Sequence, residues 1–77
     1  MPTLQRFGAL SVRMYADDHH PPHFHIVGRD FQVLVQISDF AILAGQARSG
    51  QIAEAMSWAK DQKAVLEQKW AELNERE

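Results

Sequence analysis

The spacing of the apolar residues changes once along this chain, and that change constrains the fold more than any other feature. Within residues 9–15, 23–27 and 31–37 apolar and polar side chains alternate, which is the period of half-buried β-strands. From residue 49 onward the apolar residues recur at intervals of three and four in a segment rich in Ala, Glu, Lys and Gln, which predicts helix. A block of strands followed by a block of helix is typical of the α+β class.

The strand block is predicted to form a three- or four-stranded antiparallel meander. A short extended arm is expected to reach Phe7 and Gly8, and the strands are expected at roughly 8–15, 23–27, 31–37 and 40–44. The alternation is clearest in the third strand, where Phe31, Val33 and Val35 share one side. Gly45 is expected to stop the weaker fourth run.

The helical block is predicted to cover residues 50–75, as one long helix or as two shorter ones. The polar run 60–63 is the place where a break is allowed. We expect the apolar stripe to pack on one face of the sheet, with a groove for a partner helix as the alternative. The stripe consists of Ile52, Ala55, Met56, Ala59, Leu66, Trp70 and Leu73, with Trp58 beside it.

Length and composition limit the classes of protein that the chain can belong to. At 77 residues it is expected to be a single domain with a thin core, because a domain of this size buries only about 60% of the surface of its unfolded chain. It has no cysteine, which excludes disulfides, thiolate zinc sites and a cysteine nucleophile. A net charge of −2 gives no overall attraction to nucleic acid, and no apolar run approaches a membrane span. We therefore expect a cytoplasmic protein without membrane contact.

The chemistry of the sequence is concentrated in residues 17–25, which hold all four histidines, two aspartates and two adjacent prolines. The prolines stiffen this connection between two strands. In the strand that follows, His23 and His25 point to the same side, with Cα atoms about 6.5–7 Å apart. Two imidazoles at that spacing can chelate one divalent ion, zinc or another metal, and His19, His20, Asp17 or Asp18 could complete the ligand set.

A second interpretation of the same residues is a polar recognition face. If the first two strands form a hairpin, Arg13 and Tyr15 share a face with His23 and His25. This face would bind a protein partner or, as a further alternative, the phosphate backbone of RNA. General acid–base catalysis is the remaining alternative, although no catalytic residue can be assigned. The predicted recognition residues are Arg13, Tyr15, His20, Gln32 and Gln36.

The run Asp18-His19-His20-Pro21-Pro22-His23-Phe24-His25-Ile26 resembles the hallmark of a small prokaryotic family, domain of unknown function 4160. The opening Met1-Pro2-Thr3, the strand end Arg13-Met14-Tyr15, and Trp58 and Trp70 with Leu66 between them are similar to that family as well. The resemblance implies that His19, His23 and His25 are the site positions, together with Asp18, Pro21 and Pro22, whereas His20 occupies a variable slot. It also implies membership of toxin–antitoxin-like gene pairs, with no established reaction.

Together these patterns predict a non-enzymatic interaction module that presents a His/Asp cluster. The expected partner is another protein or a second copy of the chain. The first alternative is a divalent-metal-binding domain, and the second is an RNA-binding or RNA-cleaving toxin.

Overall fold

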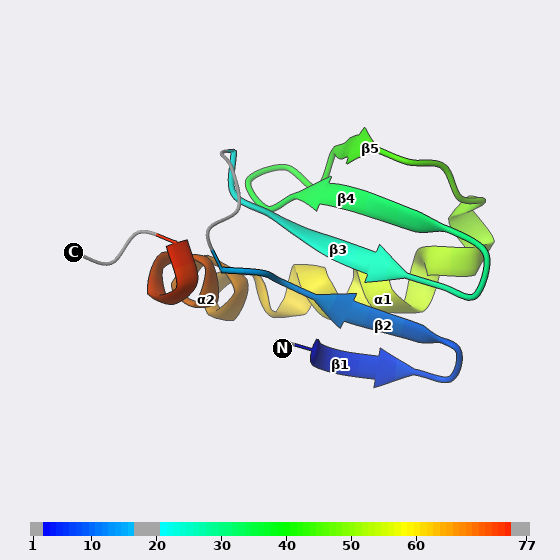
Figure 1. Ribbon diagram of the computed structural model, residues 1–77, viewed down its shortest axis with the longest axis horizontal. Coiled ribbons are helices and arrows are strands. Elements are labelled where there is room, and N and C mark those ends of the chain that lie inside the picture. Colours follow the sequence, from blue (N-terminus) through cyan, green and yellow to red (C-terminus); the bar gives the residue numbers. More distant parts are fainter. Residues whose placement is uncertain (1–2, 17–20, 75–77) are drawn as a thin grey trace.

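The chain folds into one antiparallel sheet and two helices in the computed structural model, which describes residues 3–16 and 21–74. Neighbouring strands are neighbours in sequence, and Figure 1 shows α1 behind the strands and α2 beyond the end of the sheet where β2 ends and β3 begins. The α+β class and the antiparallel meander are therefore confirmed. The elements are β1 (Thr3–Phe7), β2 (Leu10–Arg13), β3 (His23–Val27), β4 (Gln32–Gln36), β5 (Ile42–Ala44), α1 (Ser49–Asp61) and α2 (Lys63–Asn74).

The sheet has five strands in the described part of the chain, where the sequence predicted three or four. The expected N-terminal arm is strand β1, which pairs with β2 so that Phe7 lies opposite Leu10. Gly8 has a φ of 58°, a left-handed conformation that glycine adopts without steric cost, and this permits the tight turn between the two strands. The predicted first strand at 8–15 is consequently shorter and begins at Leu10.

The last strand is also shorter than predicted. Phe40 has a φ of 61° and its backbone N–H donates to the carbonyl oxygen of Gln36 over 2.8 Å. This turn occupies the first part of the predicted strand 40–44, so β5 begins at Ile42. Gly45 follows β5 with a φ of 87°, as expected for a residue that ends a strand.

One face of the sheet carries the core. On β2, β3 and β4 the apolar residues of that face lie opposite one another, with Val12 paired to Ile26 and Phe24 paired to Val35. The helices cover these residues with their apolar stripe, which confirms the expected packing; Met56 and Trp58 are partly buried against it. The buried apolar residues are Val12, Met14, Phe24, Ile26, Val33, Val35, Ile37, Ile52, Ala55, Ala59, Leu66 and Trp70.

The helical block is divided into two helices, which is one of the two predicted arrangements. Gln62 lies between them, and its backbone N–H donates to the carbonyl oxygens of Trp58 and Ala59 over 3.1 and 3.0 Å. The break therefore falls inside the polar run 60–63. At the start of α1 the backbone N–H of Arg48 donates to Oε1 of Gln51 over 2.9 Å, which satisfies one polar group of the helix end.

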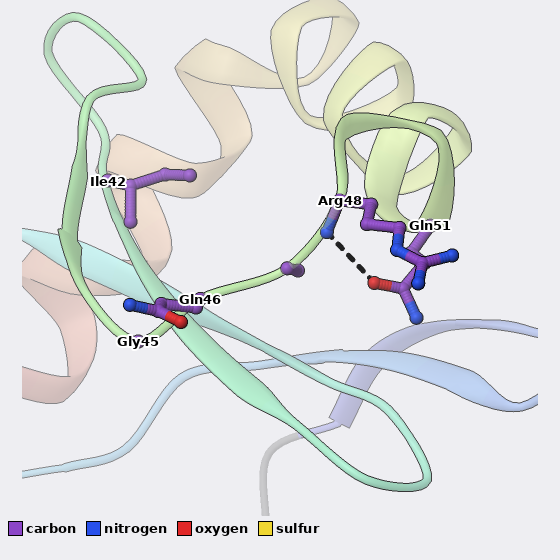
Figure 2. A pocket seen from close by; sticks show the side chains of 6 residues that line it. Ile42, Gly45, Gln46, Arg48 and Gln51 are labelled. Carbon is purple, nitrogen blue, oxygen red and sulfur yellow. Dashed lines mark hydrogen bonds between the residues drawn. The ribbon is translucent and has the colours of Figure 1, made fainter.

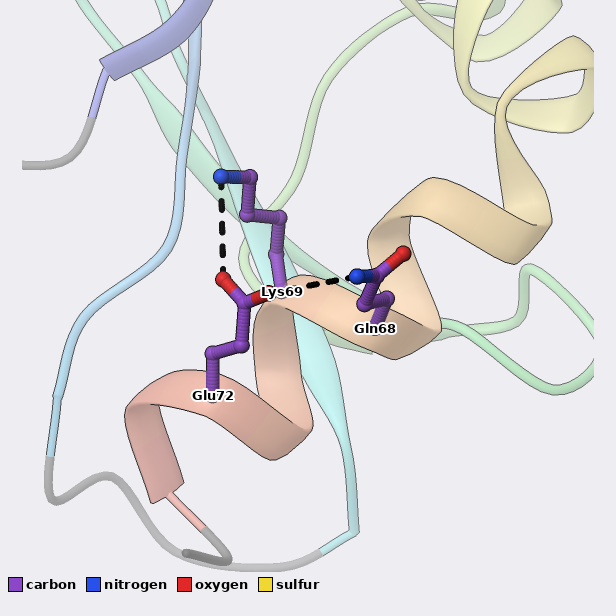
Figure 3. Close-up of polar contacts among 3 residues, drawn as sticks. All are labelled: Gln68, Lys69 and Glu72. Carbon is purple, nitrogen blue, oxygen red and sulfur yellow. Dashed lines mark hydrogen bonds and ion pairs between the residues drawn. The ribbon is translucent and has the colours of Figure 1, made fainter.

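Part of the outer surface of α2 is polar. Figure 3 shows Lys69 and Glu72 as an ion pair at 3.7 Å, with the amide of Gln68 donating to the same carboxylate over 3.3 Å. Both side chains of the ion pair are exposed to solvent. Exposed ion pairs of this kind contribute only about 0–1 kcal/mol to stability. Neither helix of the described residues has the length and apolar character that crossing a membrane requires.

Candidate recognition site on the open sheet face

The face of the sheet opposite the core carries most of the residues that the sequence singled out. The register places Arg13 of β2 opposite His25 of β3, and His25 opposite Leu34 of β4. These residues alternate with the core residues Val12, Ile26 and Val33, so they point away from α1. We call this surface the open face.

His23 is held firmly at the start of β3. Its side chain is only 3% exposed, and its Nδ1–H donates to the carbonyl oxygen of Pro21 over 2.8 Å. A neutral imidazole that is protonated on Nδ1 carries its lone pair on Nε2. The proline-fixed backbone therefore sets both the orientation of this ring and the nitrogen that can accept a proton or bind a cation.

His25 is held by a side chain from the neighbouring strand. It is 8% exposed, and its Nδ1 lies 2.8 Å from Nε2 of Gln32. In this arrangement the amide N–H of Gln32 donates to the ring. If the amide turns by half a rotation, its oxygen accepts a hydrogen bond from Nδ1–H at the same distance. Gln32 can therefore support either tautomer of His25 without moving the ring.

Four aromatic rings form a continuous row across this end of the sheet. The ring centroids of Tyr15 and His25 are 4.7 Å apart at an interplanar angle of 87°. The centroids of His25 and His23 are 5.2 Å apart, and those of His23 and Trp70 are 5.3 Å apart. An edge-to-face aromatic pair such as Tyr15 and His25 contributes about 0.5–1.5 kcal/mol beyond its burial. The ring row (Tyr15, His25, His23 and Trp70) therefore runs from the surface, where Tyr15 is 37% exposed, into the core.

The last turn of α2 is tied to the same place. The side-chain amide of Asn74 donates to the backbone carbonyl oxygen of Tyr15 over 3.0 Å. Trp70 lies one turn earlier on α2 and contacts His23 through its ring. The helix thus contacts both ends of the ring row.

Two arginines of the described residues lie on the open face. Nε of Arg13 donates to the hydroxyl oxygen of Ser11 over 3.0 Å, which orients the guanidinium along β2. Arg6 on β1 lies opposite Ser11 and so belongs to the same face. Within residues 3–16 and 21–74 neither arginine makes an ion pair. The open face therefore offers planar cations beside aromatic rings, a combination suited to carboxylates or phosphates.

The structure brings five of the predicted site residues together, namely Arg13, Tyr15, His23, His25 and Gln32. Gln36 lies opposite His23, but its amide donates to Ser38 and Asp39 over 2.7 and 3.1 Å and so stabilises a turn. Asp18, His19 and His20 lie outside the described residues, so their part in any site stays a prediction.

The predicted metal site is only partly covered by the described residues. Among them no three His, Cys, Asp or Glu side chains gather into a group that could hold a metal ion. The His23 and His25 rings do lie side by side, with His23 Nε2 as the lone-pair nitrogen of its ring. Two of the proposed ligands are therefore adjacent, and the other two are untested.

Sequence reasoning did not find the contribution of α2 to the site. Trp70 was expected in the core, which is where it lies, but its contact with His23 was not expected. Asn74 lies near the end of the predicted helical block 50–75, and the hydrogen bond from its side chain to Tyr15 was not expected either. These contacts join residues 47 and 59 positions apart, and no local pattern in the sequence encodes such a pairing.

Comparison with known proteins identifies a family. The family model described as "Domain of unknown function (DUF4160)" matches residues 10–71, which is most of the chain. The match includes the whole ring row and Arg13 and ends before Asn74. No curated protein and no solved structure gives a significant match.

Proposed function

The chain belongs to the DUF4160 family, and on that premise we propose that it is a non-enzymatic interaction module that binds an acidic segment of a partner protein on its open face. The partner is taken to be the other member of a toxin–antitoxin-like pair in a bacterial cytoplasm, as the family resemblance of the sequence suggests. The observation that carries the proposal is the ring row beside Arg13.

The order of this surface supports a role in recognition. His23 and His25 are buried and each ring nitrogen Nδ1 is hydrogen-bonded, so little conformational freedom is lost when a partner binds. Tyr15 is exposed and Arg13 is partly exposed, so a partner can reach both side chains. Tyrosine and arginine are among the residue types that most often dominate binding energy at protein interfaces.

Charge favours an acidic partner. Arg13 makes no ion pair within the described residues, so a partner carboxylate can bind its guanidinium without displacing another acid. The neighbouring Arg6 adds a second positive charge on the same face. The open face can therefore attract an acidic segment although the whole chain carries a net charge of −2.

The first prediction tests this proposal with the protein encoded by the neighbouring gene as the probe. The two proteins are produced together, and the dissociation constant of the purified complex is measured by calorimetry. Arg13→Glu and Tyr15→Ala are each expected to raise the dissociation constant at least tenfold, which corresponds to a loss of about 1.4 kcal/mol of binding free energy. Arg29→Glu is the matched control, because Arg29 is exposed in the turn between β3 and β4 and lies outside the ring row.

Three outcomes contradict the proposal. The neighbouring protein does not bind, or Arg13→Glu and Tyr15→Ala bind as tightly as the wild type, or the purified chain instead carries RNA that is released by salt. The last outcome would favour the RNA alternative, in which bases stack on Tyr15 and phosphates contact Arg6 and Arg13.

A metal-binding role is the second candidate, and the hydrogen bond of His23 favours it. Imidazoles that bind metals usually donate their other N–H to a carbonyl or carboxylate oxygen, and His23 donates Nδ1–H to Pro21 in this way. Gln32 could hold His25 in the same tautomer through its amide oxygen. Zinc or another divalent ion would then bind His23 and His25, with His19 and Asp18 as the further ligands expected from the sequence.

The second prediction tests this role by zinc titration of protein purified without a histidine tag. The metal is expected to raise the melting temperature of the wild type and to leave that of the His23→Ala/His25→Ala variant unchanged. The control is His20→Ala, which changes the histidine in the variable slot and should respond to zinc like the wild type. Equal shifts of the melting temperature in all three proteins would rule out a metal site at His23 and His25.

A further inference from the structure

The apolar face of the sheet continues beyond the cover that the helices provide. Ile42 of β5 lies opposite Val35 of β4, so it belongs to the same face as the core. Val35 is fully buried, whereas Ile42 is 47% exposed. Since soluble chains usually bury large aliphatic residues on a core-facing side, Ile42 marks a part of the core face that is open to solvent.

This open part is the floor of a groove between β5 and α1. A hollow of about 500 Å³ lies there, and its apolar walls include Ile42, Ile52, Ala53 and Met56. A second hollow of about 550 Å³ adjoins it at the start of α1 and shares Ile42 and Ala47 with it. We call the combined hollow the α1 groove.

Both ends of the α1 groove are positively charged. Arg48 lies at one end, where Figure 2 shows it on the helix side with Gln51 while Ile42 projects from the strand side. Lys60 lies at the other end. Lys60 follows Arg48 by twelve positions, and along a helix twelve positions correspond to a separation of about 18 Å between the two ends of the groove. Both cations are exposed and make no ion pair within the described residues, and no carboxylate lines either hollow.

The edge of β5 is a poor template for an added strand. The strand has three residues, and its pairing with β4 is interrupted between Leu34 and Val35. Short and irregular edges are features that prevent edge-to-edge pairing. An occupant of the α1 groove therefore gains its affinity from side-chain packing, as a helix in a groove does.

A second copy of the chain fits the charges badly. In a symmetric dimer the same surface faces itself. If two α1 helices packed in parallel, each Lys60 would face the Lys60 of the other copy. If they packed antiparallel around Ala53 and Met56, each Lys60 would lie near Arg48 of the other copy. Both arrangements bring like charges together, which opposes association.

We propose that the α1 groove binds an amphipathic helix of another protein that carries acidic residues at both ends of its apolar stripe. The stripe would have the spacing i, i+3, i+4 and i+7, and the acids would lie about three turns apart to reach Arg48 and Lys60. This surface is separate from the open face and does not depend on the function proposed for it.

The third prediction tests the groove with a displayed library of 16-residue helices that have an apolar stripe and randomised flanking positions. The full-length chain is expected to select helices with Asp or Glu at both ends of the stripe. Binding of a selected peptide should weaken about tenfold in Ile42→Asp, because a buried unpaired carboxylate replaces the apolar floor. Val65→Asp is the matched control, since Val65 is similarly exposed on α2, away from the groove.

A charge exchange separates recognition from a mere effect on folding. Lys60→Glu changes an exposed side chain, so the fold should be kept, and the variant should prefer peptides with Lys at the matching end. Selection of peptides without acidic enrichment, binding that Ile42→Asp leaves unchanged, or self-association through this face in sedimentation would each overturn the proposal.

Discussion

At the scale of single residues, Gly45 links a backbone conformation to the candidate site. Its φ of 87° lies in the left-handed region, and a Cβ built there would collide with the carbonyl oxygen of Gln32. Gln32 is the residue that holds the ring of His25. A side chain at position 45 would therefore strain the end of β5 and displace the strand that positions a site residue.

The fourth prediction compares two glycine substitutions of opposite effect. Gly45→Ala is expected to lower the free energy of unfolding by about 2 kcal/mol or more, because the left-handed conformation and the collision both cost free energy. Gly50→Ala is the control. Gly50 belongs to α1, and a Cβ at this position would meet open space. Because alanine favours a helix more than glycine does, Gly50→Ala should raise the free energy of unfolding by about 0.5–1 kcal/mol.

Urea unfolding of the two variants and the wild type measures both effects. Two alanine variants of equal stability would show that the close approach of Gly45 to Gln32 is unimportant. The ring protons of His25, observed by NMR, provide a second readout. They should shift in Gly45→Ala and stay unchanged in Gly50→Ala.

At the scale of elements, much of the fold could be predicted from the sequence because the periods of strand and helix are local. The alternation from Phe31 to Ile37 gives the core face of β4, and the helical stripe gives the buried side of α1 and α2. The two departures have local causes that composition does not encode. Phe40 adopts a positive φ that shortens β5, and Gly8 makes the turn that adds β1.

The candidate site was predictable only as far as the alternation within a strand and the pairing of neighbouring strands determine it. The i, i+2 spacing places His23 and His25 side by side, and the hairpin register brings Arg13 next to His25. Trp70 and Asn74 complete the surroundings of the site from the other end of the chain. Their contacts depend on how α2 lies against the sheet, which is a property of the packed molecule.

At the scale of the whole molecule, α2 connects the C-terminal part of the chain to the open face. Through Trp70 it contacts the buried end of the ring row, and through Asn74 it holds the backbone of Tyr15. A change in the last turn of α2 should therefore alter the open face even though α2 also contributes Leu66 and Trp70 to the core.

The fifth prediction tests this connection with Asn74→Ala. Loss of the hydrogen bond to Tyr15 should lower stability by only about 0.5–1.5 kcal/mol, so the fold should survive. The backbone of Tyr15 would no longer be held by α2 through this hydrogen bond. The NMR signals of the Tyr15 and His25 rings should therefore shift together, because the two rings are in contact. The control is Gln68→Ala on the same helix, which removes only an exposed hydrogen bond to Glu72 and should leave both rings unchanged. If Asn74→Ala also leaves both rings unchanged, the hydrogen bond from Asn74 has no part in shaping the recognition surface.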